Sequence, residues 1–174
     1  MIKKRYTVLI LFVTLISLST IGMSMGLFDF TKIYLFSEVN AIVTNKGQPV
    51  VGAEVTRTVQ FRHKKYPNAT TTTDAQGRFH FDALVDSSLF DKYSLSHILV
   101  WQQLHIRYQG KEYLAWDLAK SNLRSEGEFS ADPEGEFSDG TVTKIPVLTC
   151  ELTSEPRDIK VWIGNSLLKT ICTW

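Results

Sequence analysis

The sequence predicts an all-β fold, an antiparallel β-sandwich preceded by one hydrophobic helix at the N-terminus. Three observations predict this class: short runs in which apolar and polar residues alternate, Gly- and Pro-containing turns between those runs, and little helical periodicity. The chain has 174 residues, 44% of them hydrophobic and 21% charged, which is a globular composition. This length fits one domain of ordinary size and a leader.

Residues 1–26 form the leader. Lys3, Lys4 and Arg5 begin it, and residues 6–25 then contain no charge. This pattern is typical of a signal peptide or a transmembrane anchor, and Ser24-Met25-Gly26 places small residues where a signal peptidase reads. Because basic residues stay on the cytoplasmic side, we expect the chain at a bacterial inner membrane, facing the periplasm, or in the periplasm after cleavage. A translation start at Met25 would instead leave the domain in the cytosol.

Residues 27–174 are expected to form a single β-sandwich domain, with its strands between residues 34 and 174. The clearest strand has Ile98, Val100, Leu104 and Ile106 on one parity, which predicts that these four side chains are buried. Gln109-Gly110 follows as a hairpin turn, and an apolar run resumes at 112–116. The other expected strands are 38–44, 53–61, 70–73, 79–81, 145–152, 159–163 and 167–173. Two segments, 87–93 and 116–123, could each form two helical turns.

Residues 47–55 and 72–81 resemble the signature of transthyretin-like, carboxypeptidase-regulatory-like β-sandwich domains. In this signature Gly47-Gln48-Pro49 turns the chain, and Gly52-Ala53 is small enough to let the two sheets approach. Asp74 and Gly77 make a tight turn before Phe79 and Phe81, which we expect to point inward. The resemblance implies a prealbumin-like or Ig-like sandwich and no particular activity. Residues 34–39, 108–116 and 150–152 are similar to a bacterial family of unassigned function.

Charge and motif spacing exclude several function classes. The 19 Lys and Arg nearly balance 18 Asp and Glu, so the basic excess expected of a nucleic-acid-binding protein is absent. The histidines show no metal-ligand spacing, and the sequence contains no Gly-x-Ser-x-Gly elbow and no P-loop, so we predict neither a cofactor nor a catalytic residue. His105 is interpreted as a surface residue because the sequence places no carboxylate to orient it. Two charged segments, basic 57–65 and acidic 126–139, are interpreted as solvated loops.

Two groups of residues remain as candidate sites, one for a metal ion and one for a disulfide. Carboxylates and glycines alternate after residue 131, where Ca²⁺ could be bound through Asp132, Glu134, Glu136 and Asp139, although a solvated acidic loop explains the same pattern. Cys150 shares parity with Leu148 and Leu152, and Cys172 lies near the chain end. Two cysteines of one exported sandwich are typically paired, so we predict a disulfide between Cys150 and Cys172.

Two functions fit these observations. The first is a non-enzymatic cell-envelope binding domain that contacts a protein partner, one version being an immunity protein that neutralises a delivered toxin. The alternative is a cell-envelope enzyme or carbohydrate-binding module whose site is assembled from distant residues, around Trp101, Trp116, His105 and Asp117. An exposed platform formed by Trp101 and Trp116 would favour the alternative, because most tryptophans belong to the core.

Overall fold

The computed structural model describes residues 33–86, 99–121, 123, 127–129, 145–161 and 166–174. The leader, the possible helical turns at 87–93, Ile98 and the four calcium candidates lie outside these residues. The described part is all-β, and its one helical element is the short 3-10 turn η3 (Gly127–Phe129). Within the same part of the chain, no helix has the length and apolarity needed to cross a membrane.

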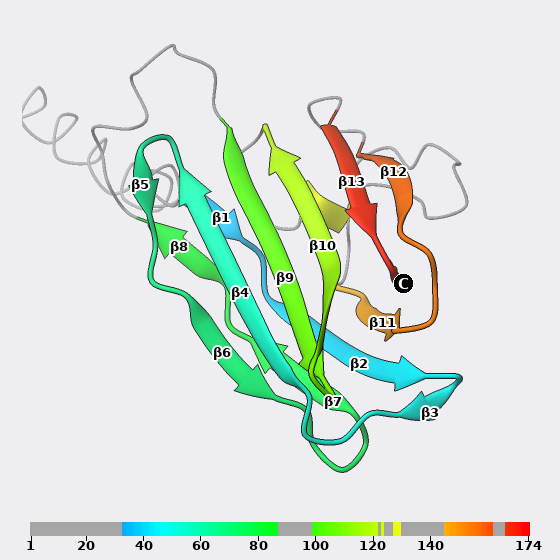
Figure 1. Ribbon diagram of the computed structural model, residues 1–174. Coiled ribbons are helices and arrows are strands. Elements are labelled where there is room, and N and C mark those ends of the chain that lie inside the picture. Colours follow the sequence, from blue (N-terminus) through cyan, green and yellow to red (C-terminus); the bar gives the residue numbers. More distant parts are fainter. Residues whose placement is uncertain (1–32, 87–98, 122, 124–126, 130–144, 162–165) are drawn as a thin grey trace, which may run out of the picture. The chain divides into compact units, whose positions relative to one another are not determined.

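The strands form a seven-stranded and a five-stranded sheet and a small two-stranded ribbon (Figure 1). The seven-stranded sheet has the order β12 (Arg157–Val161), β13 (Ser166–Thr170), β10 (Lys111–Lys120), β9 (Val100–Tyr108) and β4 (Glu54–Phe61), with β5 (Lys64–Lys65) and β6 (Ala69–Thr72) both paired to β4. The five-stranded sheet has the order β14 (Cys172–Thr173), β11 (Val147–Glu151) and β2 (Val39–Asn45), with β3 (Gln48–Pro49) and β7 (Arg78–Phe81) both paired to β2. The ribbon pairs β1 (Ile33–Phe36) with β8 (Leu84–Asp86).

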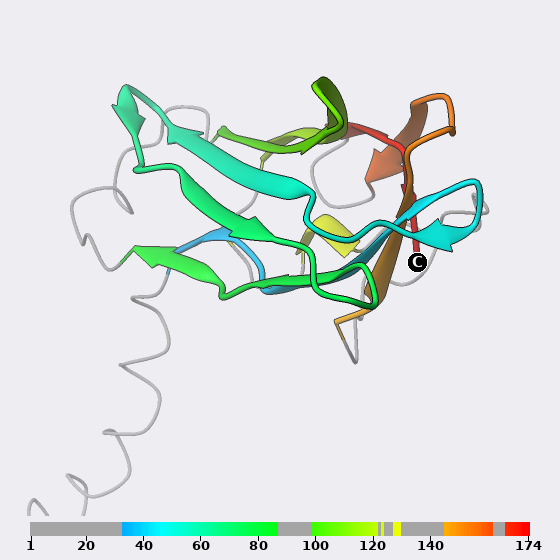
Figure 2. The same ribbon diagram turned by 60° about the horizontal axis from the view of Figure 1, so that its bottom comes forward.

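The core lies between two layers, as the sequence predicts for a sandwich. Figure 2 shows β4 and β9 in one layer and β2 and β7 in the other, with η3 in yellow between them. The inward parity of β9 is confirmed at Val100, Leu104 and Ile106, which are all buried, and Phe79 and Phe81 point inward as expected. The largest side chains in the core include Trp116, Phe36, Phe61, Leu35, Leu118, Leu148 and Leu168.

The expectation of a purely antiparallel fold is wrong at one strand pair. β11 runs parallel to β2, with Cys150 opposite Val43 in the register, so the five-stranded sheet is mixed. A parallel pair needs a long crossover connection. Here the chain between β2 and β11 first builds most of the opposite sheet, and this long excursion returns it to β2 in the same direction.

The predicted hairpin at Gly110 is confirmed, whereas the helical turn predicted for 116–123 is wrong. Gln109 and Gly110 both have positive φ, 50° and 75°, as a two-residue type I′ turn requires. Residues 116–120 continue β10 because this strand is central, with its backbone paired to β9 on one side and to β13 on the other. Ladders on both sides satisfy the backbone groups that a helix would otherwise pair internally.

The two signature turns form as expected, but the role of Gly52 differs from the prediction. At Gly77 (φ 73°) an added Cβ would lie 2.6 Å from the carbonyl oxygen of Val43, so the backbones approach too closely for any side chain. The Asp74 carboxylate closes this turn by accepting hydrogen bonds from the N–H groups of Gln76 and Arg78, both at 2.8 Å. At Gly52 a Cβ would meet nothing within 4 Å. Gly52 is therefore required by its positive φ and not by close approach of the sheets.

The disulfide predicted from the sequence is present. Cys150 and Cys172 lie directly opposite each other in the β11–β14 ladder, with their Cα atoms 4.0 Å apart. Both residues are completely buried. The bond therefore fastens the end of the chain to the five-stranded sheet.

Candidate functional site

The outer face of the seven-stranded sheet is the side of β4, β9 and β10 that points away from the core. It contains hydroxyl and amide side chains, one tryptophan and a group of charges. Its members from these three strands include Glu54, Thr56, Thr58, Gln60, Trp101, Gln103, His105, Arg107, Glu112 and Asp117. We use "outer face" for this set. Three members form a row across the strands: Gln103 donates to Asp117 at 3.2 Å and accepts from Thr58 at 3.5 Å.

Trp101 lies at one end of the outer face and is 49% exposed. Its cross-strand neighbours are Gln60 on β4 and Ala119 on β10. Beside it is a hollow of about 440 Å³, which we call the Trp101 hollow. The residues that line it are Thr58, Val59, Gln60, Lys65, Tyr66, Asn68, Trp101 and Gln103.

Trp116 does not belong to this face, so the two-tryptophan platform considered for the alternative function is not formed. Its side chain is 1% exposed and packs against the rings of Phe129 and Trp174, with centroid distances of 5.8 and 6.0 Å. A register irregularity between Leu114 and Trp116 in β10 is the reason why Trp116 points into the core and not to the outer face. One extra residue in a strand turns the following side chains to the opposite face.

The other end of the outer face is charged. His105 Nδ1 lies 2.8 Å from Glu112 Oε1, and Arg107 lies 3.6 Å from the carboxylate of Glu54. These four side chains line a second hollow of about 220 Å³, which shares Thr58 and Asn68 with the Trp101 hollow. His105 is therefore a partly exposed surface residue, but the prediction that no carboxylate would orient it is wrong. The hairpin register places Glu112 opposite Arg107 and diagonal to His105.

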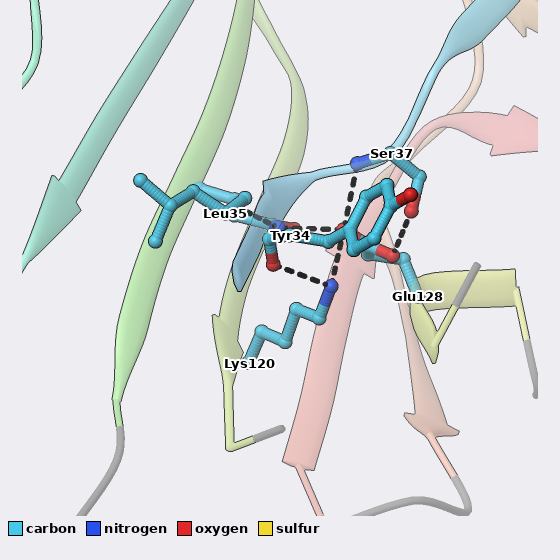
Figure 3. A network of polar contacts seen from close by, with 6 residues as sticks. Tyr34, Leu35, Ser37, Lys120 and Glu128 are labelled. Atoms are coloured by element: carbon cyan, nitrogen blue, oxygen red, sulfur yellow. Dashed lines mark hydrogen bonds and ion pairs between the residues drawn. The ribbon is translucent and has the colours of Figure 1, made fainter. Parts of the chain in front are cut away.

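A buried polar network lies on the opposite, core side of the same sheet (Figure 3). Glu128 of η3 is completely buried, and its Oε1 accepts hydrogen bonds from Lys120 Nζ at 2.9 Å and from Gln102 Nε2 at 2.7 Å. The same carboxylate accepts from the backbone N–H of Ser37 at 3.0 Å and from its hydroxyl at 2.6 Å. We call Ser37, Gln102, Lys120 and Glu128 the buried polar network.

The buried polar network joins the β1 segment to the sheet. Lys120 also donates to the Tyr34 carbonyl at 3.1 Å, and Gln102 donates to the Leu35 carbonyl at 2.6 Å. Burial lowers the pKa of the Lys120 ammonium, and the adjacent Glu128 carboxylate opposes that shift. Four donors around one carboxylate compensate the cost of burying its charge. The arrangement therefore acts as a clamp between β1, β9, β10 and η3.

The sequence interpretation missed these buried charges. Glu128 was assigned to a solvated acidic loop, and its hydrogen-bond donors come from three other segments: the residue after β1, β9 and β10, at sequence separations of 91, 26 and 8 residues. Gln102 offered a signal, because it occupies the inward parity between Val100 and Leu104. A polar residue at a core position predicts a buried partner.

Arg57 was also assigned to a solvated loop and is in fact 8% exposed. Its guanidinium lies 5.6 Å from the ring centroid of Phe36 and 5.0 Å from that of Phe81. It donates to the Asp82 carbonyl at 2.5 Å. Cation–π contacts and this hydrogen bond explain how a cation occupies an inward position of β4.

A carboxylate outside both sites fixes the hairpin between β2 and β3. Glu151 accepts hydrogen bonds from the N–H groups of Lys46 and Gly47 at 2.8 and 2.9 Å, and from the N–H and hydroxyl of Thr153 at 3.0 and 2.5 Å. Partial desolvation by itself raises the pKa of Glu151, but the Thr153 hydroxyl and the three N–H donors lower it to about 2. No cluster of three potential metal ligands occurs within the described ranges.

The family model named "Domain of unknown function (DUF6795)" matches residues 39–155, more than half of the chain. The chain belongs to the DUF6795 family. The DUF6795 match begins at β2 and extends past β11, so it includes the whole outer face and three members of the buried polar network. Searches of curated proteins and of solved structures found no match to the chain.

Proposed function

We propose that this chain is a non-enzymatic binding domain of the cell envelope, and that the outer face around Trp101 contacts its ligand. One observation carries the proposal: a large aromatic side chain is half exposed beside a hollow, on a central strand paired on both sides. Strands held on both sides keep binding groups in place, so little conformational entropy is lost on association. Aromatic side chains of this kind dominate binding surfaces.

Two further observations support the cell-envelope assignment. The leader has a positive start and a long uncharged run, and the buried Cys150–Cys172 disulfide suits an oxidising compartment. Fractionation of a tagged full-length chain tests it, with the expected result being recovery in the membrane or periplasm. A chain that starts at Met25 is the matched control and should stay in the cytosol. Recovery of both forms in the cytosol would contradict the assignment.

A protein is the first partner class to test, because the outer face carries both charge signs and opposite charges speed encounter with a complementary surface. A photo-crosslinking residue is placed at Gln103 in cells, and the control chain carries it at Thr149 on the exposed side of the five-stranded sheet. We expect a discrete adduct from position 103 that disappears with Trp101→Ala. Identical adducts from both positions, or no adduct at 103, would contradict a protein-binding role for the outer face.

The toxin-immunity version of this proposal predicts one property more. The adduct from position 103 should contain a single toxic protein, and Trp101→Ala should remove protection against it without lowering the amount of folded chain. Protection that survives the substitution would exclude immunity through this face.

A further inference from the structure

We propose that the Trp101 hollow is a binding site for a neutral saccharide, with a sugar ring packed on the exposed side of the indole. This inference rests on the proposed function and names the ligand class of the same face. It follows from three features: the exposed tryptophan, the chemistry of the lining and the presence of a second hollow next to the first.

The indole supplies the apolar part of the recognition. Trp101 is 49% exposed, and its neighbour on β10 is Ala119, whose methyl group is too small to cover the ring. The C–H bonds on one side of a pyranose ring are slightly positive, and they pack well on the negative face of an aromatic ring. A sugar ring combines such an apolar side with hydroxyl groups around its edge. It can therefore pack on the Trp101 indole and form hydrogen bonds with the polar side chains around it.

The lining supplies hydrogen bonds for uncharged groups. Thr58, Gln60, Asn68 and Gln103 carry hydroxyl or amide groups, which can each both donate and accept. Sugar hydroxyls have the same double capacity, whereas an anion only accepts and an ammonium only donates. The one cationic side chain of the lining, Lys65, is exposed. The set therefore matches a neutral polyhydroxylated ligand better than an ion.

Thr58, Gln103 and Tyr66 are held in place before any ligand arrives. Gln103 is held between Asp117 at 3.2 Å and Thr58 at 3.5 Å, and Tyr66 donates its hydroxyl hydrogen to Asp86. Prearranged polar groups lose less entropy when they bind.

The size of the site indicates more than one sugar unit. The Trp101 hollow measures about 440 Å³, within the range of about 300–1,000 Å³ typical of small-molecule sites. The second hollow, about 220 Å³, continues from it past Thr58 and Asn68 toward His105. We infer that one unit of an oligosaccharide packs on Trp101 and the next lies over Thr58 and Asn68.

The test uses the purified full-length or exported chain with a panel of neutral trisaccharides built from glucose, galactose, mannose or N-acetylglucosamine. Calorimetry and tryptophan fluorescence measure binding. At least one member should bind with a Kd between about 10 µM and 10 mM, and Trp101→Ala should weaken it at least tenfold, with Trp101→Phe retaining part of the affinity. Leu167→Ala, an exposed apolar position at 63% on another strand of the sheet, is the matched control and should bind normally. Affinity should not change between low and high salt, since no charges pair.

Each outcome decides the inference. No binding across the panel, or equal binding by the Trp101→Ala variant, overturns it. Binding restricted to uronic-acid-containing sugars and weakened by salt also overturns it, because the ligand would then be an anion paired with Lys65. A position-103 protein adduct without saccharide binding removes this inference and leaves the proposed function standing. Failure of both experiments removes both.

Discussion

Replacing Glu128 by Gln tests whether the buried polar network stabilises the fold. The substitution preserves shape but removes the negative charge that Lys120 contacts at 2.9 Å in a site where the two side chains are 1% and 0% exposed. In the native protein both carboxylate oxygens accept hydrogen bonds, from Ser37 and Gln102 among others. The substitution replaces one of these oxygens by an amide NH₂ group, which only donates. We expect loss of stability and no change in the overall fold of the molecules that remain folded.

The magnitude follows from the burial. Removing one partner of a buried ion pair costs about 3–5 kcal/mol because the other charge stays buried without compensation. Lys120→Met should cost less, about 3 kcal/mol, since the Glu128 carboxylate keeps its donors from Ser37 and Gln102. Ser37→Ala removes one hydroxyl bond to a charged acceptor and should cost about 1.5–3 kcal/mol. The double change Lys120→Met with Glu128→Gln should cost less than the sum of the single changes.

The assay is urea unfolding followed by tryptophan fluorescence and circular dichroism, with the disulfide intact. Lys111→Met and Glu155→Gln are matched controls at exposed positions and should change stability by less than about 0.5 kcal/mol. If Glu128→Gln leaves the midpoint within the range of these controls, the network does not stabilise the fold. A double variant whose cost equals the sum of both single costs would show that Lys120 and Glu128 do not interact.

Three other perturbations test single contacts. Reduction, or Cys172→Ser without reductant, should lower stability by about 3 kcal/mol for a closed segment of 22 residues; two free thiols in the oxidised protein under denaturing, non-reducing conditions would refute the bond. Gly77→Ala should lower the stability of the fold by more than about 2 kcal/mol in thermal melts, because the added Cβ would collide with the Val43 carbonyl oxygen. Gly110→Ala, at a similar φ but with open space around the Cβ, is the control and should cost about 1 kcal/mol. Equal costs for the two variants would mean that the close approach of the Val43 carbonyl does not matter. Because the folded pKa of Glu151 is about 2, below its ordinary value of 4.5, its carboxylate stabilises the fold above pH 4.5 and loses this effect as the pH falls toward 2. Glu151→Gln should therefore cost about 1 kcal/mol of stability at pH 7, a value reduced for solvent screening. The difference in unfolding free energy between this variant and the parent, measured by urea unfolding, should shrink as the pH falls from 4.5 to 2. A difference that stays constant across this range would contradict a stabilising role of the ionised Glu151 carboxylate.

Local signals predicted much of the strand framework. Alternation identified the buried side of β9 at Val100, Leu104 and Ile106, and Gln109-Gly110 identified its hairpin with β10. A two-residue turn also fixes the register, so the contact between His105 and Glu112 could have been deduced from the sequence by counting back from the turn. The partner of Cys150 followed from parity and compartment, because only two cysteines are present.

The candidate site was predicted only in part. Trp101 and His105 share one face, as their parity in β9 predicts, whereas Asp117 joins them only because of the register irregularity in β10. Trp116 was wrongly grouped with them, because a register irregularity one residue long inverts the faces and no periodicity in β10 reveals its position.

The sequence by itself determined most of the strand segments and the tight turns, since these depend on residues near one another in the chain. It also determined which cysteines can pair, because only two are present. Only the tertiary structure decided that β11 lies parallel to β2 and that the outer face carries a hollow beside Trp101. It also decided that Lys120 and Glu128 are buried together with Gln102 and Ser37. A charge is buried only where distant segments supply its hydrogen-bond partners, and a hollow exists only where side chains of separate strands leave space. Both conditions depend on how strands far apart in the sequence are placed beside one another, and local patterns do not specify that placement.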